Sequence, residues 1–298
     1  MDYIKKKKIG EGTYATIYLA SKQNIPNVAI KRMKKTKYSV GHDISVIREI
    51  KTLKQIKNKY ILDLIEIYIQ NDDIHLVLEY VETDLECIIN NKQIFILPSD
   101  VKSWMLMILT GVHKLHEKFI LHRDIKPNNI LVSRSGLIKI ADFGLSRSIG
   151  SKMTSQVVTR WYRAPELLLG AKQYGFGVDM WSIGCIFAEL MLRVPLFAGE
   201  SDLEQLNLIF KVFGTPKLHS YPSLKDLPGF MEFQEKEGIK LESLFTAASI
   251  DALSLLKKFF IYDPNKRINT YEALNDNYFS SDPKPTQPKN LPFFMAHE

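Results

Sequence analysis

The spacing of hydrophobic residues changes near Leu85, and this change constrains the fold more than any other feature. Before it, short apolar runs predict strands at residues 3–9, 17–20, 28–33, 64–69 and 74–80, the last two joined by a turn at residues 71–73. One helix interrupts them from Asp43, where five apolar residues recur every three positions: Ile44, Ile47, Ile50, Leu53 and Ile56. From Leu85 onward the period is helical, which predicts a β-rich part followed by an α-rich part.

The helical part contains several separate helices. We expect them at 98–119, 178–192, 201–214, 249–260 and 271–274. Four prolines between Asp282 and Pro292 predict a tail that lies on the surface or is loose. The predicted fold class is α+β with two lobes. A small β-rich lobe with one main helix takes residues 1–81, a large α-rich lobe takes 82–279, and the tail takes 280–298, with a hinge near 79–84.

Composition excludes several classes of protein. No run of 18 or more apolar residues exists, so we expect no membrane-spanning helix. The two cysteines, Cys87 and Cys185, match neither a metal site nor a disulfide framework, which favours an intracellular protein. Residues 1–60 hold 15 Lys and Arg against four Asp and Glu, while the whole chain has a net charge of +7. These lysines lack interleaved stacking aromatics, so we expect no sequence-specific nucleic-acid binding.

Polar residues concentrate in two strings between residues 122 and 144. The first reads His122-Arg123-Asp124-Ile125-Lys126-Pro127-Asn128-Asn129, and the second, after a hydrophobic run, reads Ala141-Asp142-Phe143-Gly144. A carboxylate and an amide at this spacing could lie in any loop. The complete strings, so close together, are very improbable by chance.

Together these strings resemble the catalytic loop and magnesium signature of eukaryotic Ser/Thr protein kinases. The resemblance extends from Tyr3 to Phe279. It implies that Asp124 accepts the proton of a substrate hydroxyl and that Lys126 stabilises the transferred phosphoryl group. It also implies that Asn129 and Asp142 hold the two Mg²⁺ ions that clamp the phosphates of ATP.

The small lobe carries the matching nucleotide motifs. In Gly10-Glu11-Gly12-Thr13-Tyr14-Ala15 the glycines allow a tight turn over phosphates, although alone this string predicts no more than a hairpin. Val28-Ala29-Ile30-Lys31 follows at the expected distance and implies that Lys31 binds the α and β phosphates, with Glu49 as its ionic partner. The resemblance implies an ATP site made of Ile9, Gly10, Glu11, Gly12, Thr13, Tyr14, Ala15, Ile17, Ala29, Lys31, Leu78, Glu79, Val81, Asp84 and Leu131.

Within the protein kinases, the chain is most similar to the cyclin-dependent kinases and, among these, to the CDK-activating branch. The similarity lies in Ser45-Val46-Ile47-Arg48-Glu49, Val157 to Glu166, Glu82-Thr83-Asp84-Leu85-Glu86 and Ile120 to Asp124. It implies a nuclear kinase that binds a cyclin H-like partner, a RING-finger assembly factor and the transcription factor TFIIH. The implied substrates are activation segments of other cyclin-dependent kinases and the Ser-Pro repeats of the RNA polymerase II tail.

The resemblance also implies a switch and a set of structural residues. Thr154 stands at the activating phosphosite, and Arg48, Arg123 and Arg147 stand where they would bind its phosphate. Three crowded guanidinium groups repel one another, so a phosphate between them would order the segment. The implied structural residues are Glu166, Arg267 and Asp179.

Two alternatives stay open at this point. Thr13 and Tyr14 resemble the inhibitory phosphorylation pair of cell-cycle members, so the chain could be a cell-cycle kinase regulated there. A catalytically dead, cyclin-binding scaffold is a more remote reading. Such a scaffold would normally lose one of its motif residues, and Lys31, Asp124, Asn129 and Asp142 are all present.

Overall fold

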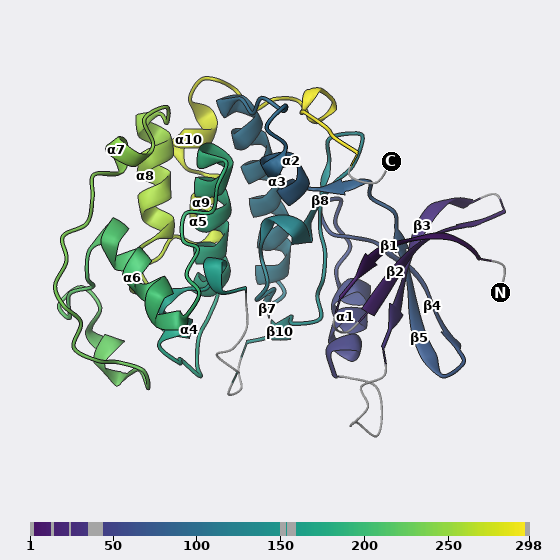
Figure 1. The fold of residues 1–298 in the computed structure, drawn as a ribbon, viewed down its shortest axis with the longest axis horizontal. Helices are drawn as coiled ribbons and strands as arrows, with labels where there is room; N and C mark the ends of the chain where they lie inside the picture. Colours follow the sequence, from purple (N-terminus) through teal and green to yellow (C-terminus); the bar gives the residue numbers. More distant parts are fainter. Residues whose placement is uncertain are drawn as a thin grey trace.

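The protein folds into two lobes (Figure 1), which a computed structural model describes over residues 3–12, 15–23, 25–34, 44–149, 153 and 159–295. The smaller lobe is an antiparallel sheet with the strand order β1-β2-β3-β5-β4. Its strands are β1 (Ile4–Glu11), β2 (Ala15–Lys22), β3 (Ile25–Met33), β4 (Leu64–Gln70) and β5 (Asp73–Glu79). The β4–β5 turn places Asn71 and Asp72 at φ 50° and 62°, a left-handed conformation that Asn and Asp tolerate.

Helix α1 (Ile44–Gln55) packs under this sheet, close to its predicted place in the sequence. Its apolar residues recur every three positions but do not share one face. In the structure Ile44 and Ile47 are 61% and 58% exposed, whereas Leu53 is only 1% exposed. An α-helix turns by about 100° per residue, so a spacing of three falls about 60° short of a full turn at each step. The apolar residues spaced by three therefore wind around the helix, so that Ile44 and Ile47 face solvent while Val46 between them is buried.

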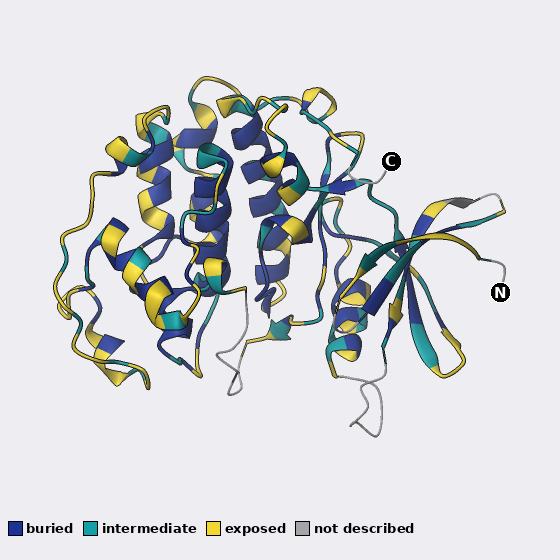
Figure 2. Ribbon diagram, in the orientation of Figure 1, coloured by how far each residue is buried: buried dark blue, intermediate teal, exposed yellow. Residues whose placement is uncertain are grey.

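The larger lobe is built around α5 (Gly177–Leu192), which is buried along most of its length (Figure 2). It packs against α3 (Pro98–His116) and α8 (Ile250–Phe259). The ring of Trp181 is fully buried and meets Phe260 edge to face at 4.8 Å. The remaining helices are α2 (Leu85–Asn90), α4 (Pro165–Leu168), α6 (Asp202–Phe213), α7 (Leu241–Leu244), α9 (Thr270–Leu274) and α10 (Asn277–Ser280). The predicted two-lobed α+β fold is confirmed.

The α-rich lobe also contains short strands that the sequence did not predict. Two small antiparallel sheets lie at the junction of the lobes: β6 (Thr83–Asp84), β8 (Ile130–Val132) and β9 (Ile138–Ile140) form one, and β7 (Ile120–Leu121) and β10 (Arg147–Ser148) form the other. Short 3₁₀ turns complete the lobe: η1 (Pro127–Asn129), η2 (Arg160–Tyr162), η3 (Pro222–Asp226) and η4 (Pro288–Asn290). Strands of two or three residues are too short to show a period of two, so the hydrophobic pattern does not reveal them.

The C-terminal segment after α10 packs on the large lobe. Leu291 is 7% exposed and Phe293 packs against the hydrophobic core. The residues up to 295 therefore lie on the surface and are held there, which is the first of the two possibilities expected for this tail. Within the described ranges, no helix combines the length and the apolar character needed to cross a bilayer.

Candidate active site

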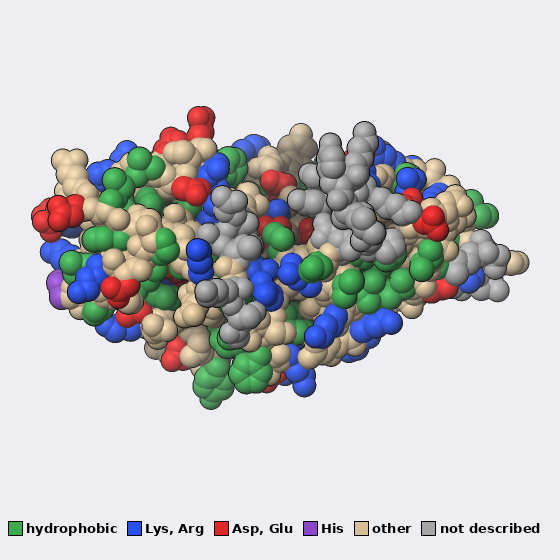
Figure 3. Space-filling view, turned by 90° about the horizontal axis from the view of Figure 1, so that it is seen from below, with side chains coloured by type: hydrophobic (Ala, Val, Ile, Leu, Met, Phe, Trp, Pro, Cys, Tyr) green, Lys and Arg blue, Asp and Glu red, His purple; other side chains and the backbone are tan. Residues whose placement is uncertain are grey.

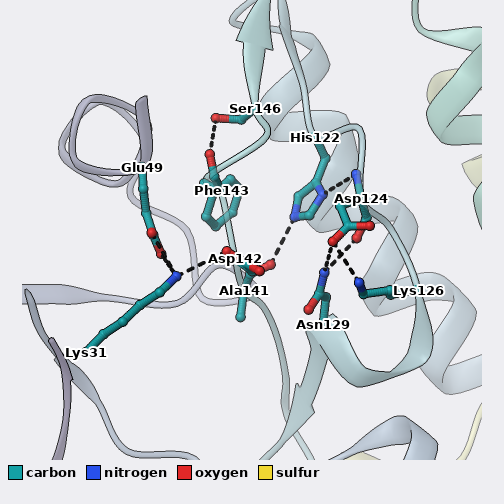
Figure 4. A network of polar contacts seen from close by, with 10 residues as sticks. All are labelled: Lys31, Glu49, His122, Asp124, Lys126, Asn129, Ala141, Asp142, Phe143 and Ser146. Atoms are coloured by element: carbon teal, nitrogen blue, oxygen red, sulfur yellow. Dashed lines mark hydrogen bonds and ion pairs between the residues drawn. The ribbon is translucent and has the colours of Figure 1, made fainter. Parts of the chain in front are cut away.

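A buried ion pair joins the two halves of the small lobe. Lys31 lies on β3, a strand flanked by β2 and β5, and its Nζ is 2.8 Å from both carboxylate oxygens of Glu49 on α1 (Figure 4). The Glu49 side chain is 2% exposed and that of Lys31 is 11% exposed. Burial opposes the charge of Lys31, but the carboxylates of Glu49 and Asp142 outweigh it and raise the pKa of Lys31 above its usual value. The pair predicted from sequence is present, and α1 is held against the sheet.

The catalytic-loop string forms a compact polar cluster in the large lobe (Figure 4). One carboxylate oxygen of Asp124 is 2.9 Å from Lys126 Nζ and accepts a hydrogen bond of 2.9 Å from the Asn129 amide. The same amide nitrogen donates to the backbone oxygen of Asp124 at 2.8 Å. Lys126 also donates to Thr159 Oγ1 at 2.9 Å, and the Thr159 N–H donates to Asp124 Oδ1 at 3.3 Å. The carboxylate of Asp124 is thus oriented from three sides.

Buried groups behind this cluster fix its backbone. Asp179, at the start of α5, accepts hydrogen bonds from the backbone N–H groups of His122 and Arg123 and from the ring of His116. Arg123 has φ 67°, a left-handed conformation that costs a non-glycine residue about 1–2 kcal/mol. Burial opposes the charge of Asp179, but the His116 hydrogen bond and nearby charges hold the pKa of Asp179 below its usual value. Asp179 therefore stabilises a strained loop as an anion.

His122 connects the two motif strings. Its Nδ1 accepts a hydrogen bond from the backbone N–H of Asp124 at 3.2 Å, so its proton must lie on Nε2, which donates to the Ala141 carbonyl at 3.0 Å. The ring also meets Phe143 at 4.9 Å, and Phe143 is fully buried. The next turn is closed by Ser146, whose hydroxyl donates to the Phe143 carbonyl at 2.7 Å.

Asp142 points into the space between Lys31 and the Asp124 cluster (Figure 4). Its Oδ1 is 3.1 Å from Lys31 Nζ, its side chain is 48% exposed, and its φ is 61°. Desolvation opposes its charge, but Lys31 outweighs that effect and lowers the pKa of Asp142. Asn129 uses its amide nitrogen for both bonds to Asp124, and its amide oxygen has no hydrogen-bond partner in the described part of the chain. Carboxylate and amide oxygens are hard ligands of the kind that Mg²⁺ prefers.

The other residues predicted to bind ATP belong to the sheet of the small lobe, the segment after β5, and β8. Ile9, Gly10, Glu11, Gly12, Ala15, Ile17 and Ala29 belong to β1, β2, β3 and the β1–β2 turn, Leu78 and Glu79 end β5, Val81 and Asp84 follow it, and Leu131 lies on β8. Thr13 and Tyr14 lie outside the described residues. The Glu79 N–H donates to the Asp63 carbonyl at 3.0 Å, so only the carbonyl of Glu79 is left to bond a base. The Asp84 carboxylate caps α2 by accepting from the Cys87 N–H at 2.8 Å.

Comparison with known proteins decides the family. The sequence model for the protein kinase domain matches residues 3–279.

The chain belongs to the protein kinase family.

Individual relatives place this kinase among the cyclin-dependent kinases. It is 51% identical to the probable serine/threonine-protein kinase KIN28 homolog of Encephalitozoon cuniculi, over 97% of this chain and 99% of the relative. It is 44% identical to cyclin-dependent kinase 7 of Xenopus laevis, over 97% and 84% of the two chains. Among solved structures it is similar to the CAK complex of Chaetomium thermophilum bound to ATP-gamma-S, with a TM-score of 0.92, 40% identity, and 97% and 94% of the two chains covered. The chain is a protein serine/threonine kinase of the cyclin-dependent family.

Two of the three arginines predicted to bind a phosphate share a hollow in this kinase, and the third is buried. Arg48 of α1 and Arg147 of β10 line one hollow of about 290 Å³ together with Lys51. Arg123 is 1% exposed, and it donates to the Leu145 carbonyl at 2.7 Å and to the Tyr174 hydroxyl at 2.8 Å. Thr154, the predicted phosphosite, lies outside the described residues.

Two of the predicted structural residues of the kinase, Glu166 and Arg267, form an ion pair. Arg267 makes two bonds with the Glu166 carboxylate, at 2.8 Å and 3.0 Å, and neither side chain is more than 2% exposed. The same guanidinium donates to the carbonyls of Ile261, Gly177 and Tyr262. This pair joins the start of α4 to the loop after α8.

Sequence reasoning missed several residues that complete the site. Thr159 bonds both Lys126 and Asp124, although it lies more than 30 positions away, and nothing in its own surroundings in the sequence indicates this contact. Lys139 on β9 pairs with the Glu79 side chain at 2.7 Å and so bridges the large lobe and the hinge. Its position three residues before Asp142 is the only signal that could have drawn attention to it.

Proposed function

We propose that the kinase transfers the γ-phosphoryl group of ATP to Ser or Thr hydroxyls by means of the cluster in Figure 4. In this reaction the substrate oxygen forms a bond to the γ-phosphorus while the bond from that phosphorus to the β–γ bridging oxygen breaks. The Asp124 carboxylate orients the hydroxyl and takes its proton. Lys126, which is fixed by Asp124 and Thr159, offers positive charge to the phosphoryl oxygens as charge develops there.

The small-lobe residues hold the nucleotide in this proposal. Lys31 binds the α and β phosphates, and Glu49 and Asp142 keep it charged and fixed. The oxygens of Asn129 and Asp142 are the ligands for Mg²⁺, which when bound neutralises phosphate charge. No cluster of three His, Cys, Asp or Glu side chains within the described ranges could hold a metal alone. This fits a site that takes its remaining ligands from the nucleotide and water.

A cyclin H-like protein is the proposed partner, and the exposed part of α1 is its proposed contact. Ile44 and Ile47 are 61% and 58% exposed, and Phe119, just before β7, is 66% exposed. Hydrophobic side chains and Lys or Arg side chains gather on the small-lobe half of the face shown in Figure 3. A cyclin that covers these residues would keep α1 in the position where Glu49 meets Lys31. A RING-finger assembly factor and TFIIH are proposed as further members of the complex, in the nucleus.

The proposed substrates are activation segments of other cyclin-dependent kinases and the Ser-Pro repeats of the RNA polymerase II tail. Support comes from the resemblance to the CDK-activating branch and from the likeness to the CAK complex. The single observation that carries the proposed chemistry is the assembled pair of clusters, Lys31–Glu49–Asp142 and Asp124–Lys126–Asn129.

A substrate panel tests this proposal against the cell-cycle alternative. The cyclin complex would be assayed side by side on a polymerase-tail peptide, an inactive cyclin-dependent kinase and a histone-type Ser-Pro-basic peptide. We expect the first two to be phosphorylated with the higher kcat/KM. Preference for the histone-type peptide would instead favour a cell-cycle kinase regulated at Thr13 and Tyr14.

A further inference from the structure

The C-terminal residues of the kinase run back toward the hinge. After α10 the chain crosses the large lobe past the start of α3 and approaches β8 (Figure 1). We call residues 286–295 the C-terminal strap. None of the roles assigned above uses these residues, yet they make specific contacts along their length.

The strap is anchored at its start to the first turn of α3. The Thr286 N–H donates to the Ser99 carbonyl at 3.1 Å, and the Thr286 hydroxyl donates to Asp100 Oδ1 at 2.5 Å. Asp100 is 3% exposed and also accepts from the Leu97 N–H, so its position is fixed. Further along, Leu291 is buried in the main hydrophobic core. These anchors define where the middle of the strap must lie.

The middle of the strap lies directly against the turn of the β8–β9 hairpin. Gly136, in that turn, has φ +79°, and a Cβ added to it would stand 1.6 Å from the Pro288 carbonyl oxygen. Backbone therefore meets backbone with no room for a side chain. The turn itself is closed by the Gly136 N–H, which donates to the Ser133 carbonyl at 2.8 Å.

The same hairpin is tied to the hinge and to the site. Leu131 of β8 pairs with Asp84, and β9 continues into Asp142. The Arg134 N–H donates to the Glu82 carboxylate in the hinge at 3.1 Å, and the Arg134 guanidinium lies 2.8 Å from Met295 Sδ at the end of the strap. The hairpin thus contacts the strap through Gly136 and Arg134, and the hinge through Arg134 and Leu131.

We infer that the C-terminal strap is a positioning element for ATP: it wedges the β8–β9 hairpin against the hinge and so preorganises the floor of the nucleotide site. The inference rests on the proposed use of Leu131, Asp84 and Asp142 to hold ATP and Mg²⁺. Releasing the strap lets the hairpin shift, and part of the binding free energy of ATP is then spent on ordering it. Couplings between two such sites typically change affinity by about 5-fold or more. A partner that lifts the strap would weaken ATP binding without touching the cleft.

Two variants and one control test the strap. Leu291→Asp places a charge in the hydrophobic core where Leu291 is buried and should release the strap. Gly136→Ala adds a Cβ that pushes Pro288 away from the β8–β9 turn. Lys289→Ala changes an exposed strap residue and is the matched control. Hydrogen exchange of the Thr286 N–H, which donates to Ser99, reports whether the strap is released. The dissociation constant for ATP with Mg²⁺ is measured by fluorescence titration in the absence of any protein substrate.

We expect rapid exchange at Thr286 and an ATP dissociation constant raised by about 5-fold or more in both variants, with Lys289→Ala like the parent. Should Leu291→Asp fail to fold, Gly136→Ala decides alone. A released strap with an ATP affinity within twofold of the parent would overturn the inference. Binding is scored separately from phosphoryl transfer, so a parent that binds ATP and phosphorylates no peptide would overturn the proposed function and leave the strap result standing.

Discussion

Asp179→Asn should lower both the stability of the protein and its kcat more than the removal of one surface charge would. In the parent, one oxygen of Asp179 accepts from the Arg123 N–H at 2.9 Å, and the other accepts from the His122 N–H at 3.0 Å and from His116 at 2.9 Å. Asparagine keeps one acceptor oxygen but turns an NH₂ group toward a donor. At least one buried backbone N–H then loses its bond to a charged acceptor.

The expected losses of stability and of kcat follow from these contacts. Losing one hydrogen bond to a charged group and leaving its donor unpaired costs about 2–4 kcal/mol. With roughly 2.1 cal/mol/K per residue for the entropy of unfolding, a chain of this length loses about 3–6 °C in Tm. Arg123 can also relax from its φ of 67°, which shifts Asp124. A shift of about 1 Å at the reacting group can lower kcat about 100-fold.

The assay combines calorimetry with steady-state kinetics. Asp251→Asn is the matched control, because Asp251 also lies in the first turn of a helix, α8, and its loss reproduces any effect on the helix dipole. We expect Asp179→Asn to lower both Tm and kcat well beyond the control, with a smaller change in KM for ATP. Equal Tm values for the two variants together with an unchanged kcat would refute the claim that Asp179 holds the loop.

Three further predictions follow from buried charges. Lys31→Met should lower kcat by about 10²–10³ in a peptide-phosphorylation assay, because it removes the charge held by Glu49; an unchanged kcat would count against the nucleotide role of Lys31. Arg267→Met should lower the free energy of unfolding by about 3–5 kcal/mol in urea denaturation, because Glu166 is left charged and unpaired; a cost below 1 kcal/mol would contradict this. Burial raises the pKa of Glu189 to about 7 from 4.5, so between these pH values the folded protein binds a proton that the unfolded chain has lost, and stability falls as pH rises. Glu189→Gln should remove that slope, and parallel stability curves for parent and variant between pH 5 and 8 would contradict this prediction.

The sequence predicted those parts of the protein whose chemistry is local. The strings around Asp124 and Asp142 predict the groups proposed here for catalysis, because kinases need those side chains in that order. The strands of the small lobe and the long apolar helix α5 were also predictable, since each is long enough to show its period.

Contacts between distant segments were not predictable in the same way. Thr159 reaches Asp124 and the strap reaches Gly136 only because the fold brings them together. On α1, the spacing of the apolar residues alone does not show that Ile47 faces solvent while Leu53 faces the core. The rotation of about 100° per residue separates the two, and the exposed residues form the surface proposed for a cyclin.

The most direct test of the central claim is the rate of phosphoryl transfer from ATP to a polymerase-tail Ser-Pro peptide by the cyclin complex, measured for the parent and for Asp124→Asn. Asparagine keeps the size of the side chain and an acceptor oxygen but cannot take the proton. Proton transfer to a positioned base contributes about 10²–10⁴ to the rate, so we predict a loss of that size. Equal rates for the parent and the variant would contradict the assignment of Asp124 as the catalytic base.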